Sequence, residues 1–153
     1  MENNWIDKVL KEQYQFVRVL KRNEKTEICV FRHKTLGKQI IKRTMQSSGE
    51  VYSVLKNFSH PNIANIYDVI KTDTGIIVLE EFIDGQTIAD YLQESLYVPS
   101  GVKKIASALC DALDFLHSHK IIHKDIKPEN VMIDNNGNVK LIDYDAARIY
   151  KPY

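Results

Sequence analysis

The sequence predicts an α+β fold, in which a small antiparallel sheet with one helix is followed by a mainly helical region that carries a hairpin. Three observations lead to this prediction. Short apolar segments separated by turn-forming residues fill the first half of the chain, which is typical of strands. One long apolar stripe with helical spacing follows in the second half. Near the end, the turn sequence Asn-Asn-Gly-Asn at 135–138 joins two short apolar runs, 131–133 and 139–142, and indicates a hairpin.

Five strands are expected in the first half of the chain. They cover residues 14–20, 27–33, 38–42, 65–71 and 75–81. The second and third are separated by Thr-Leu-Gly, and the fourth and fifth by Thr-Asp-Thr-Gly, both of which are turn-forming sequences. Consecutive strands joined by such short polar turns are expected to pair in antiparallel fashion.

Helices are expected before, between and after these strands in the sequence. Near the N-terminus, Trp5, Val9 and Leu10 form the apolar side of a short helix. Residues 48–58 have helical spacing, with Ser48 as the expected N-cap and an end ahead of Pro61. A short helix is expected near 88–92 and a longer one over 100–119. The longer helix carries one apolar stripe, formed by Val102, Ile105, Ala106, Leu109, Ala112, Leu113 and Leu116.

The composition excludes several classes of function. The 153 residues include 21 basic and 20 acidic side chains, so a net charge of +1 gives no strong attraction to nucleic acid or anionic membrane. No apolar run is longer than four residues, the length of Ile76–Leu79, whereas a membrane-spanning helix needs about 20. The two cysteines, Cys29 and Cys110, are expected to be reduced core thiols of a cytoplasmic protein.

The most informative stretch is His-Lys-Asp-Ile-Lys-Pro-Glu-Asn at residues 123–130. It offers a carboxylate to orient a hydroxyl, a lysine to balance phosphate charge and an amide oxygen to bind a metal, which phosphoryl transfer uses together. Asp143 follows Asp125 by 18 residues, and a carboxylate there suits magnesium, which prefers oxygen ligands. Lys42 on the third strand supplies a second cation for phosphate.

These motifs make the chain resemble the first half of a eukaryotic-type serine/threonine protein kinase domain. The H-x-D-x-K-x-x-N loop, the later aspartate and the strand lysine occur in the order typical of that family. His-Pro-Asn-Ile at 60–63 resembles the family's turn after its first helix, and residues 79–85 resemble its hinge. The resemblance divides the chain into an N-lobe-like part (1–81), a hinge (82–85) and a partial C-lobe (86–153).

The resemblance implies ATP and magnesium as cofactors and a serine or threonine hydroxyl of a protein as substrate. Asp125 would be the catalytic base that orients this hydroxyl, and Lys127 would neutralise the transferred phosphoryl group. Asn130 and Asp143 would bind magnesium.

The resemblance also implies a set of nucleotide-binding residues. Lys42 would hold the α- and β-phosphates, with Glu50 as its ion-pair partner from the first helix. The backbone of Glu81 and Ile83 would bond the adenine, and Met132 would pack beneath it.

The chain departs from the family pattern at several positions. Lys21, Asn23 and Thr26 stand where the glycines of the phosphate-binding loop are expected, and these side chains would hinder the close approach of backbone N–H groups to phosphate. Ile40 replaces the small alanine that covers the adenine. Counted back from the turn at 60–63, the helix glutamate falls one residue away from Glu50. The usual Asp-Phe-Gly reads Asp-Tyr-Asp at 143–145.

Two other functions compete with a protein kinase. A pseudokinase or regulatory module that binds nucleotide without turnover is favoured by the missing glycines and Ile40, and opposed by the complete set of four residues in the catalytic and metal motifs. A small-molecule phosphotransferase is suggested by Asp-Tyr-Asp at 143–145, but those enzymes usually carry histidine where Lys127 stands. The sequence ends ten residues after Asp143, so we expect the long helix to lack part of its cover and the chain to self-associate.

Overall fold

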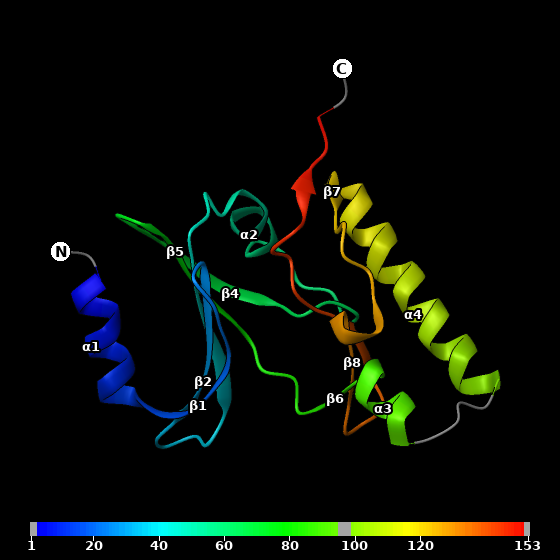
Figure 1. Ribbon diagram of the computed structural model, residues 1–153, viewed down its shortest axis with the longest axis horizontal. Coiled ribbons are helices and arrows are strands. Elements are labelled where there is room, and N and C mark those ends of the chain that lie inside the picture. Colours follow the sequence, from blue (N-terminus) through cyan, green and yellow to red (C-terminus); the bar gives the residue numbers. More distant parts are fainter. Residues whose placement is uncertain (1–2, 95–98, 152–153) are drawn as a thin grey trace. The chain divides into compact units, whose positions relative to one another are not determined.

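The computed structural model describes residues 3–94 and 99–151 (Figure 1). These residues form two compact units. The first consists of the described residues up to Asn57 together with Ile66–Phe82, and the second of Phe58–Asn65 together with the described residues from Ile83 onward. An antiparallel sheet dominates the first unit and helix α4 (Pro99–Ser118) the second, so the predicted α+β class is confirmed.

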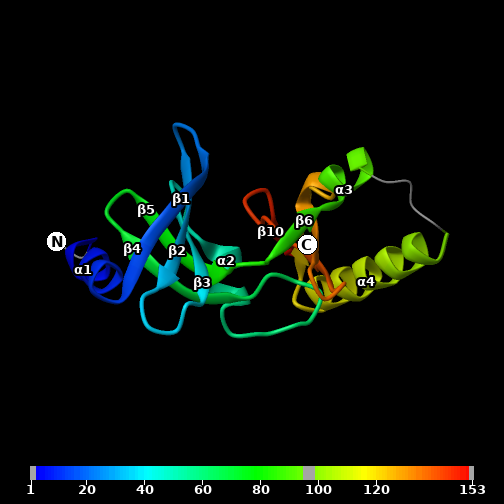
Figure 2. The same cartoon turned by 90° about the horizontal axis from the view of Figure 1, so that it is seen from below.

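The first unit is built on a five-stranded antiparallel sheet with the strand order β1-β2-β3-β5-β4 (Figure 2). All five predicted strands are present. β3 extends three residues beyond its predicted end. The strands are β1 (Tyr14–Arg22), β2 (Thr26–His33), β3 (Gln39–Met45), β4 (Ile66–Thr72) and β5 (Gly75–Glu81).

Helix α1 (Asn3–Gln13) covers one face of this sheet. Ile6 and Leu10 are buried against Ile77 of β5, and four half-buried residues complete this cluster: Tyr14, Ile40, Ile70 and Leu79. The predicted apolar side of the helix is correct at Leu10. It is wrong at Trp5, whose side chain is exposed, because Ile6 faces the sheet instead.

Helix α2 (Glu50–Leu55) lies on the opposite face. Its residue Tyr52 packs near Arg43 of β3, and the backbone of Gly49 approaches Ile76 of β5. The helix is shorter than the predicted 48–58, and Ser48 is not its N-cap. Gly49 occupies that position with φ 68°, a left-handed conformation that glycine adopts without strain, so the helix begins only at Glu50.

The second unit contains a three-stranded sheet in the order β6-β8-β9. The predicted hairpin forms from β8 (Val131–Asp134) and β9 (Val139–Leu141), and Asp134 Oδ1 closes its turn by accepting hydrogen bonds from the backbone N–H groups of Asn136 and Asn138. β6 (Gly85–Thr87) was not predicted. It requires Gly85, because a Cβ there would lie 2.0 Å from the carbonyl oxygen of Ile133.

Helices and short strands complete the second unit. α3 (Ile88–Glu94) and α4 confirm the two predicted helices of the second half. After α4, β7 (Ile121–Ile122) pairs with β10 (Arg148–Ile149), and the 3-10 helix η1 (Pro128–Asn130) leads into β8. The loop between β7 and η1 therefore holds most of the predicted catalytic motif.

Helix α4 buries only part of its predicted apolar stripe. Ala112 and Leu116 are completely buried, whereas Val102 is 53% exposed and Ile105 is half-buried. Cys110 on the same helix is also exposed, so the prediction of a core thiol is wrong there, although it is correct for Cys29 in β2. No helix in residues 3–94 or 99–151 is long and apolar enough to cross a membrane.

Candidate active site

Three of the predicted site residues meet around one carboxylate in the second unit. Asp125 Oδ2 lies 3.1 Å from Lys127 Nζ and accepts a hydrogen bond of 2.9 Å from Asn130 Nδ2. The same amide nitrogen donates to the backbone oxygen of Asp125 at 2.9 Å. Asn130 is buried, whereas Asp125 and Lys127 are more accessible. The buried amide thus fixes the carboxylate from within, and the lysine balances its charge from the solvent side.

His123 holds this loop in place. It is buried, and its Nδ1 accepts a hydrogen bond from the backbone N–H of Asp125 at 3.2 Å. Its Nε2 therefore carries the proton and donates to the carbonyl oxygen of Ile142 at 3.0 Å. Since both ring nitrogens are used, His123 has a structural role and ties the loop to the residue that precedes Asp143.

Asp143 lies two residues after the end of β9, in an uncommon backbone conformation. Its φ is 63°, and its Oδ1 accepts a hydrogen bond from the backbone N–H of Asp145 at 3.1 Å. Lys124, which precedes Asp125, has a φ of 66°. Left-handed conformations cost non-glycine residues about 1–3 kcal/mol each and cluster at functional sites. Lys124 adjoins the predicted catalytic residue Asp125, and Asp143 is itself a predicted metal ligand; Lys120, with a φ of 59°, also has this conformation.

The pair Asn130 and Asp143 fits magnesium chemically. The backbone N–H of Ile142 donates to the carbonyl oxygen of Asn130 at 2.9 Å, which brings the two segments side by side. Because the amide nitrogen of Asn130 is turned towards Asp125, its side-chain oxygen is the atom that would bind the metal. An amide oxygen and a carboxylate suit magnesium, which commonly completes its coordination with water and substrate phosphates.

The ion pair at the centre of the loop shifts two pKa values. The hydrogen bond from Lys127 holds the pKa of Asp125 below its usual value, and the hydrogen bond from Asn130 acts in the same direction. Asp125 in turn raises the pKa of Lys127. Asp125 is therefore ionised at neutral pH, as a carboxylate that accepts a hydrogen bond from a substrate hydroxyl must be.

Substitution of Lys127 by methionine should raise the titration midpoint of Asp125 towards the ordinary value of about 3.9. With its pKa depressed in the folded state, the ion pair stabilises the protein above the ordinary pKa, and this contribution is lost as the pH falls through the folded pKa. Carboxyl carbon NMR during an acid titration measures the midpoint. Lys124→Met removes a neighbouring lysine as a control, and an equal shift in both variants would contradict the specific role of Lys127.

The nucleotide-binding residues predicted in the first unit are not brought together. Lys42 Nζ forms an ion pair with Asp7 Oδ1 of α1 at 2.8 Å. Glu50 is an exposed residue at the start of α2, which packs on the other face of the sheet. Neighbouring side chains of a strand point to opposite faces, so Lys42 faces α1 rather than α2. The expected ion pair between Lys42 and Glu50 is therefore a wrong prediction.

Arg43 is the cation that faces α2, and it was not predicted as a site residue. Its Nη2 lies 2.9 Å from Glu80 Oε1 and its Nε 3.4 Å from Oε2, while the two side chains are only 5% and 6% exposed. The guanidinium carbon lies 5.9 Å from the ring centre of Tyr52. The alternation of side chains along the strand could have indicated that Arg43 is buried. Arg43 pairs with Ile28, and β2 fills this face of the sheet with apolar residues.

The turn between β1 and β2 replaces the glycine-rich loop of the resemblance. Asn23 Oδ1 accepts hydrogen bonds from the backbone N–H groups of Lys25 at 2.9 Å and Thr26 at 2.8 Å. The N–H of Asn23 donates to the carbonyl oxygen of Thr26. Backbone donors that a glycine-rich loop would offer to phosphate are thus used inside this turn, in agreement with the departure predicted at residues 21–26.

Three further predicted residues belong to different segments of the chain. Glu81 ends β5 opposite Ile40, in the first unit. Ile83 is buried near the start of the second unit, and Met132 is half-buried in β8 beside Thr87 of β6. Their roles at the adenine stay predictions.

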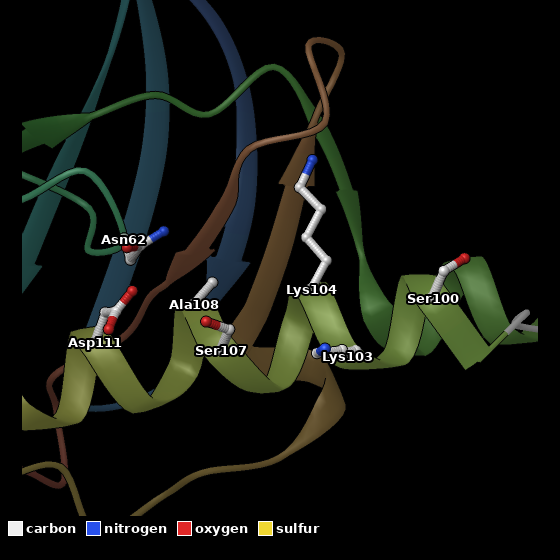
Figure 3. Close-up of a pocket in the computed structure, with 7 residues that line it drawn as sticks. All are labelled: Asn62, Ser100, Lys103, Lys104, Ser107, Ala108 and Asp111. Carbon is white, nitrogen blue, oxygen red and sulfur yellow. The ribbon is translucent and has the colours of Figure 1, made fainter.

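A polar groove of about 450 Å³ lies elsewhere in the second unit, along α4 (Figure 3). Lys104 extends from the helix towards the hairpin turn, while Asp111 lies beside Asn62 at the other end. None of the predicted site residues lines this groove. Its lining consists of Asn62, Ser100, Lys103, Lys104, Ser107, Ala108 and Asp111.

Comparison with known proteins identifies the family. The protein kinase domain matches residues 14–153. The chain belongs to the protein kinase domain family. Helix α1 precedes the matched region completely, although its residues Ile6 and Leu10 are part of the core of the first unit.

Several curated kinases are similar to this member of the family. The chain is 36% identical over 121 residues to the SNF1-like protein kinase ssp2 of Schizosaccharomyces pombe, which covers 76% of the chain and 20% of that relative. It is 32% identical over 127 residues to the carbon catabolite-derepressing protein kinase of Candida albicans, covering 82% and 20%. It is 26% identical over 153 residues to sperm motility kinase Z of Mus musculus, covering 95% and 31%. The chain thus spans between a fifth and a third of the length of these kinases.

Proposed function

We propose that the chain is the ATP- and magnesium-binding part of a serine/threonine protein kinase. The observation that carries the proposal is the Asp125 carboxylate, held by Lys127 and Asn130 in a loop that is hydrogen-bonded to the segment before Asp143. The named serine/threonine kinases among its relatives favour the same substrate class. The free cysteines are consistent with a cytoplasmic location, which we also propose.

In the proposed reaction, a protein hydroxyl attacks the γ-phosphorus of ATP. The new O–P bond forms as the bond to the β-phosphate oxygen breaks, and ADP leaves. Asp125 orients the hydroxyl and accepts its proton, while the Lys127 ammonium balances charge on the transferred group. Asn130 and Asp143 would hold magnesium, which neutralises charge on the phosphates when bound. The backbone of Glu81 and Ile83, together with Met132, would hold the adenine.

A pseudokinase is the second candidate. The closed turn at Asn23 and the ion pair of Lys42 with Asp7 both favour weak phosphate binding. The intact arrangement around Asp125 opposes it. The two candidates differ in turnover, and both require nucleotide binding.

Thermal unfolding with ATP and magnesium tests the proposal. We expect the wild-type melting temperature to rise only when both are present, because a ligand at 100 times its dissociation constant stabilises the folded state by about 2.7 kcal/mol. Asp143→Ala should remove most of this rise, whereas Asp111→Ala in the α4 groove should keep it. No rise in the wild-type protein would exclude nucleotide binding.

Turnover separates the three candidate functions once binding is established. Formation of ADP and a phosphorylated serine or threonine peptide supports the kinase. A thermal shift without ADP formation supports the pseudokinase. Phosphate transfer to a small alcohol but not to peptides would support a small-molecule phosphotransferase.

We further propose that the exposed part of the α4 stripe mediates self-association. Val102 and Ile105 leave apolar surface uncovered in the described part of the second unit. Sedimentation velocity should show species heavier than 17.7 kDa that increase with concentration. Val102→Glu should reduce them, with Lys103→Glu as a control at the neighbouring position. A monomer at all concentrations would contradict this surface.

A further inference from the structure

We propose that a pocket beside α1 in the first unit binds the C-terminal aromatic residue of a partner polypeptide. The pocket has a volume of about 330 Å³ and is lined by residues of β1, β3, β4 and β5 and of the turn that joins β2 to β3. None of the predicted catalytic or metal-binding residues lines it, so its ligand does not depend on nucleotide binding. Three features of the lining point to this ligand: an apolar wall, two donors and one buried acceptor.

The wall of the pocket is apolar. Ile40 of β3 and Leu79 of β5 line it, and both also belong to the half-buried cluster that packs against α1. Tyr67 and Leu36 line it as well, although these side chains are 56% and 66% exposed. Large apolar side chains that stay exposed around a concave site mark a place where a ligand can cover them. The volume lies near the lower end of the range for ligand sites, about 300–1,000 Å³, and suits one large side chain with its flanking groups.

Two donors at the turn between β2 and β3 suit a carboxylate. His33 Nδ1 accepts hydrogen bonds from the backbone N–H groups of Thr35 at 3.2 Å and Leu36 at 3.1 Å, so His33 Nε2 carries the proton. In the part of the chain that the structure describes, neither this N–H group nor the ammonium of Lys38 has a hydrogen-bond or ion-pair partner. Both residues line the pocket. A carboxylate accepts hydrogen bonds from two such donors, and its charge strengthens them.

Gln39 supplies the complementary acceptor. It lines the pocket, and its Oε1 is buried without a hydrogen-bond partner among the described residues. Buried side-chain oxygens are nearly always hydrogen-bonded, because an unsatisfied one costs free energy. The last torsion of a glutamine side chain is soft, so a small rotation of the amide would turn the oxygen towards a donor in the pocket. The backbone N–H of a bound peptide is such a donor.

The turn that carries the two donors is held by its own hydrogen bonds. The backbone N–H of His33 donates to the carbonyl oxygen of Lys38 at 2.8 Å, and the N–H of Gly37 donates to that of His33 at 2.9 Å. Gly37 has a φ of 70°, a conformation that favours glycine. The N–H of Lys34 donates to the carbonyl oxygen of Gln13 at the end of α1, at 2.9 Å. The donors are therefore in place before a ligand binds, which lowers the entropy cost of binding.

The charges around the pocket set the direction of the ligand. Burial raises the pKa of Tyr67, and the nearby Glu81 carboxylate raises it further. A carboxylate of the ligand would be repelled by Glu81 and attracted by Lys38, so it faces the turn, and the apolar side chain lies towards Tyr67. A C-terminal aromatic residue combines a carboxylate, a backbone N–H and an apolar side chain, and capture of a terminal carboxylate is a known mode of peptide recognition.

The test titrates the full 153-residue chain with three peptides and follows its backbone amide signals by NMR. The first peptide is acetyl-Gly-Ser-Gly-Phe with a free carboxylate. The second is the same peptide with a C-terminal amide, and the third is acetyl-Phe-Gly-Ser-Gly, which keeps the carboxylate but moves the aromatic residue. We expect the first peptide to shift the amides of residues 33–40 and to bind about tenfold more tightly than the second, the gain of one charge-assisted hydrogen bond. The third should bind more weakly than the first, because glycine does not fill the apolar pocket.

Three variants assign the contacts. Lys38→Gln should weaken binding of the free-acid peptide by up to about fivefold and leave the amidated peptide unchanged. Lys71→Gln removes the same charge from β4 at the other end of the sheet and should stay within about twofold of wild type. Gln39→Met should weaken binding by about fivefold, the loss of one hydrogen bond. It should not lower the melting temperature, because it removes a buried polar atom that has no partner.

Four results would overturn the inference. Equal affinity for the free-acid and amidated peptides would show that the carboxylate is not recognised. Shifts confined to amides outside the strands and the turn that line the pocket would place binding at another site. The absence of shifts with all three peptides at millimolar concentration would mean that solvent alone satisfies Gln39. A fall in the melting temperature of Gln39→Met would make this glutamine a structural residue.

Discussion

Substitution of Arg43 by methionine is expected to lower the free energy of unfolding of the first unit by about 3–5 kcal/mol. The reason is the carboxylate left behind. Glu80 is buried to the same degree as Arg43, and without the guanidinium its charge loses this ion-pair partner while it stays shielded from water. The contact between Arg43 and Tyr52 of α2 is lost at the same time. Urea unfolding followed by circular dichroism gives the free energy, and hydrogen exchange of the β3 and β5 amides shows where protection is lost.

Two controls separate charge burial from loss of packing. The double variant Arg43→Met with Glu80→Met removes both charges and should be far more stable than the single variant, because apolar residues of similar volume replace a buried ion pair at little cost. Arg22→Met breaks the exposed ion pair with Glu27 on β1 and β2, where the expected loss is only about 0–1 kcal/mol. A single variant that is as stable as the double variant would contradict the explanation.

The elements that the sequence predicted well are those whose cause is local. The hairpin at 131–142 depends on a turn sequence of four residues, and Asp134 adds the hydrogen bonds that close it. The five strands follow from apolar segments between turns. β6 was not predicted, because a strand of three residues is too short to show an alternating apolar pattern. The need for glycine at position 85 becomes clear only from the close approach of β8. The late start of α2 depends on the conformation of Gly49, which composition does not show.

The candidate site divides in the same way. Asp125, Lys127 and Asn130 lie within six residues of one another, so their spacing alone predicted that they would meet. Lys42 and Glu50 were paired by resemblance across two elements, and that pairing depends on the face to which a strand side chain points. A shift of one residue reverses the face. Lys42 and Arg43 are neighbours in β3, whereas their partners Asp7 and Glu80 are distant from them in the sequence. The spacing of residues therefore could not predict which partner each cation has.

Substitution of Tyr144 by alanine is expected to lower the free energy of unfolding of the second unit by about 3–5 kcal/mol. Tyr144 is 1% exposed, and its ring meets that of His123 edge-on at 5.9 Å between centres. Its hydroxyl donates to the carbonyl oxygen of Ala64 at 2.9 Å and lies 3.4 Å from that of Leu141. Alanine would leave a cavity and remove both contacts. Urea unfolding measures the loss, and hydrogen exchange of the Ala64 and Leu141 amides locates it.

Two matched variants separate the contribution of the Tyr144 ring to the free energy of unfolding from that of its hydroxyl and from the effect of removing an exposed tyrosine. Tyr144→Phe keeps the ring and should lose about 1–3 kcal/mol, the cost of leaving a buried hydrogen-bond partner unsatisfied. Tyr150→Ala removes a tyrosine that is 50% exposed and should change the free energy by no more than about 0.5 kcal/mol. Equal losses in Tyr144→Ala and Tyr150→Ala would show that the buried ring does not support this segment.

The position of Tyr144 connects this stability to the proposed metal site. Asp143 has a φ of 63°, a conformation that persists only when its surroundings hold it. Both neighbours of Asp143 are held in place. Ile142 is held by its backbone hydrogen bond to Asn130, and Tyr144 by its burial and its hydrogen bond to Ala64. When Tyr144 is removed, Asp143 can relax towards an unstrained conformation and its carboxylate can leave the position beside Asn130. In the Tyr144→Phe variant, the rise in melting temperature that ATP and magnesium produce together should therefore be smaller than in the wild-type protein. An unchanged rise would mean that the conformation of Asp143 is held without the tyrosine hydroxyl.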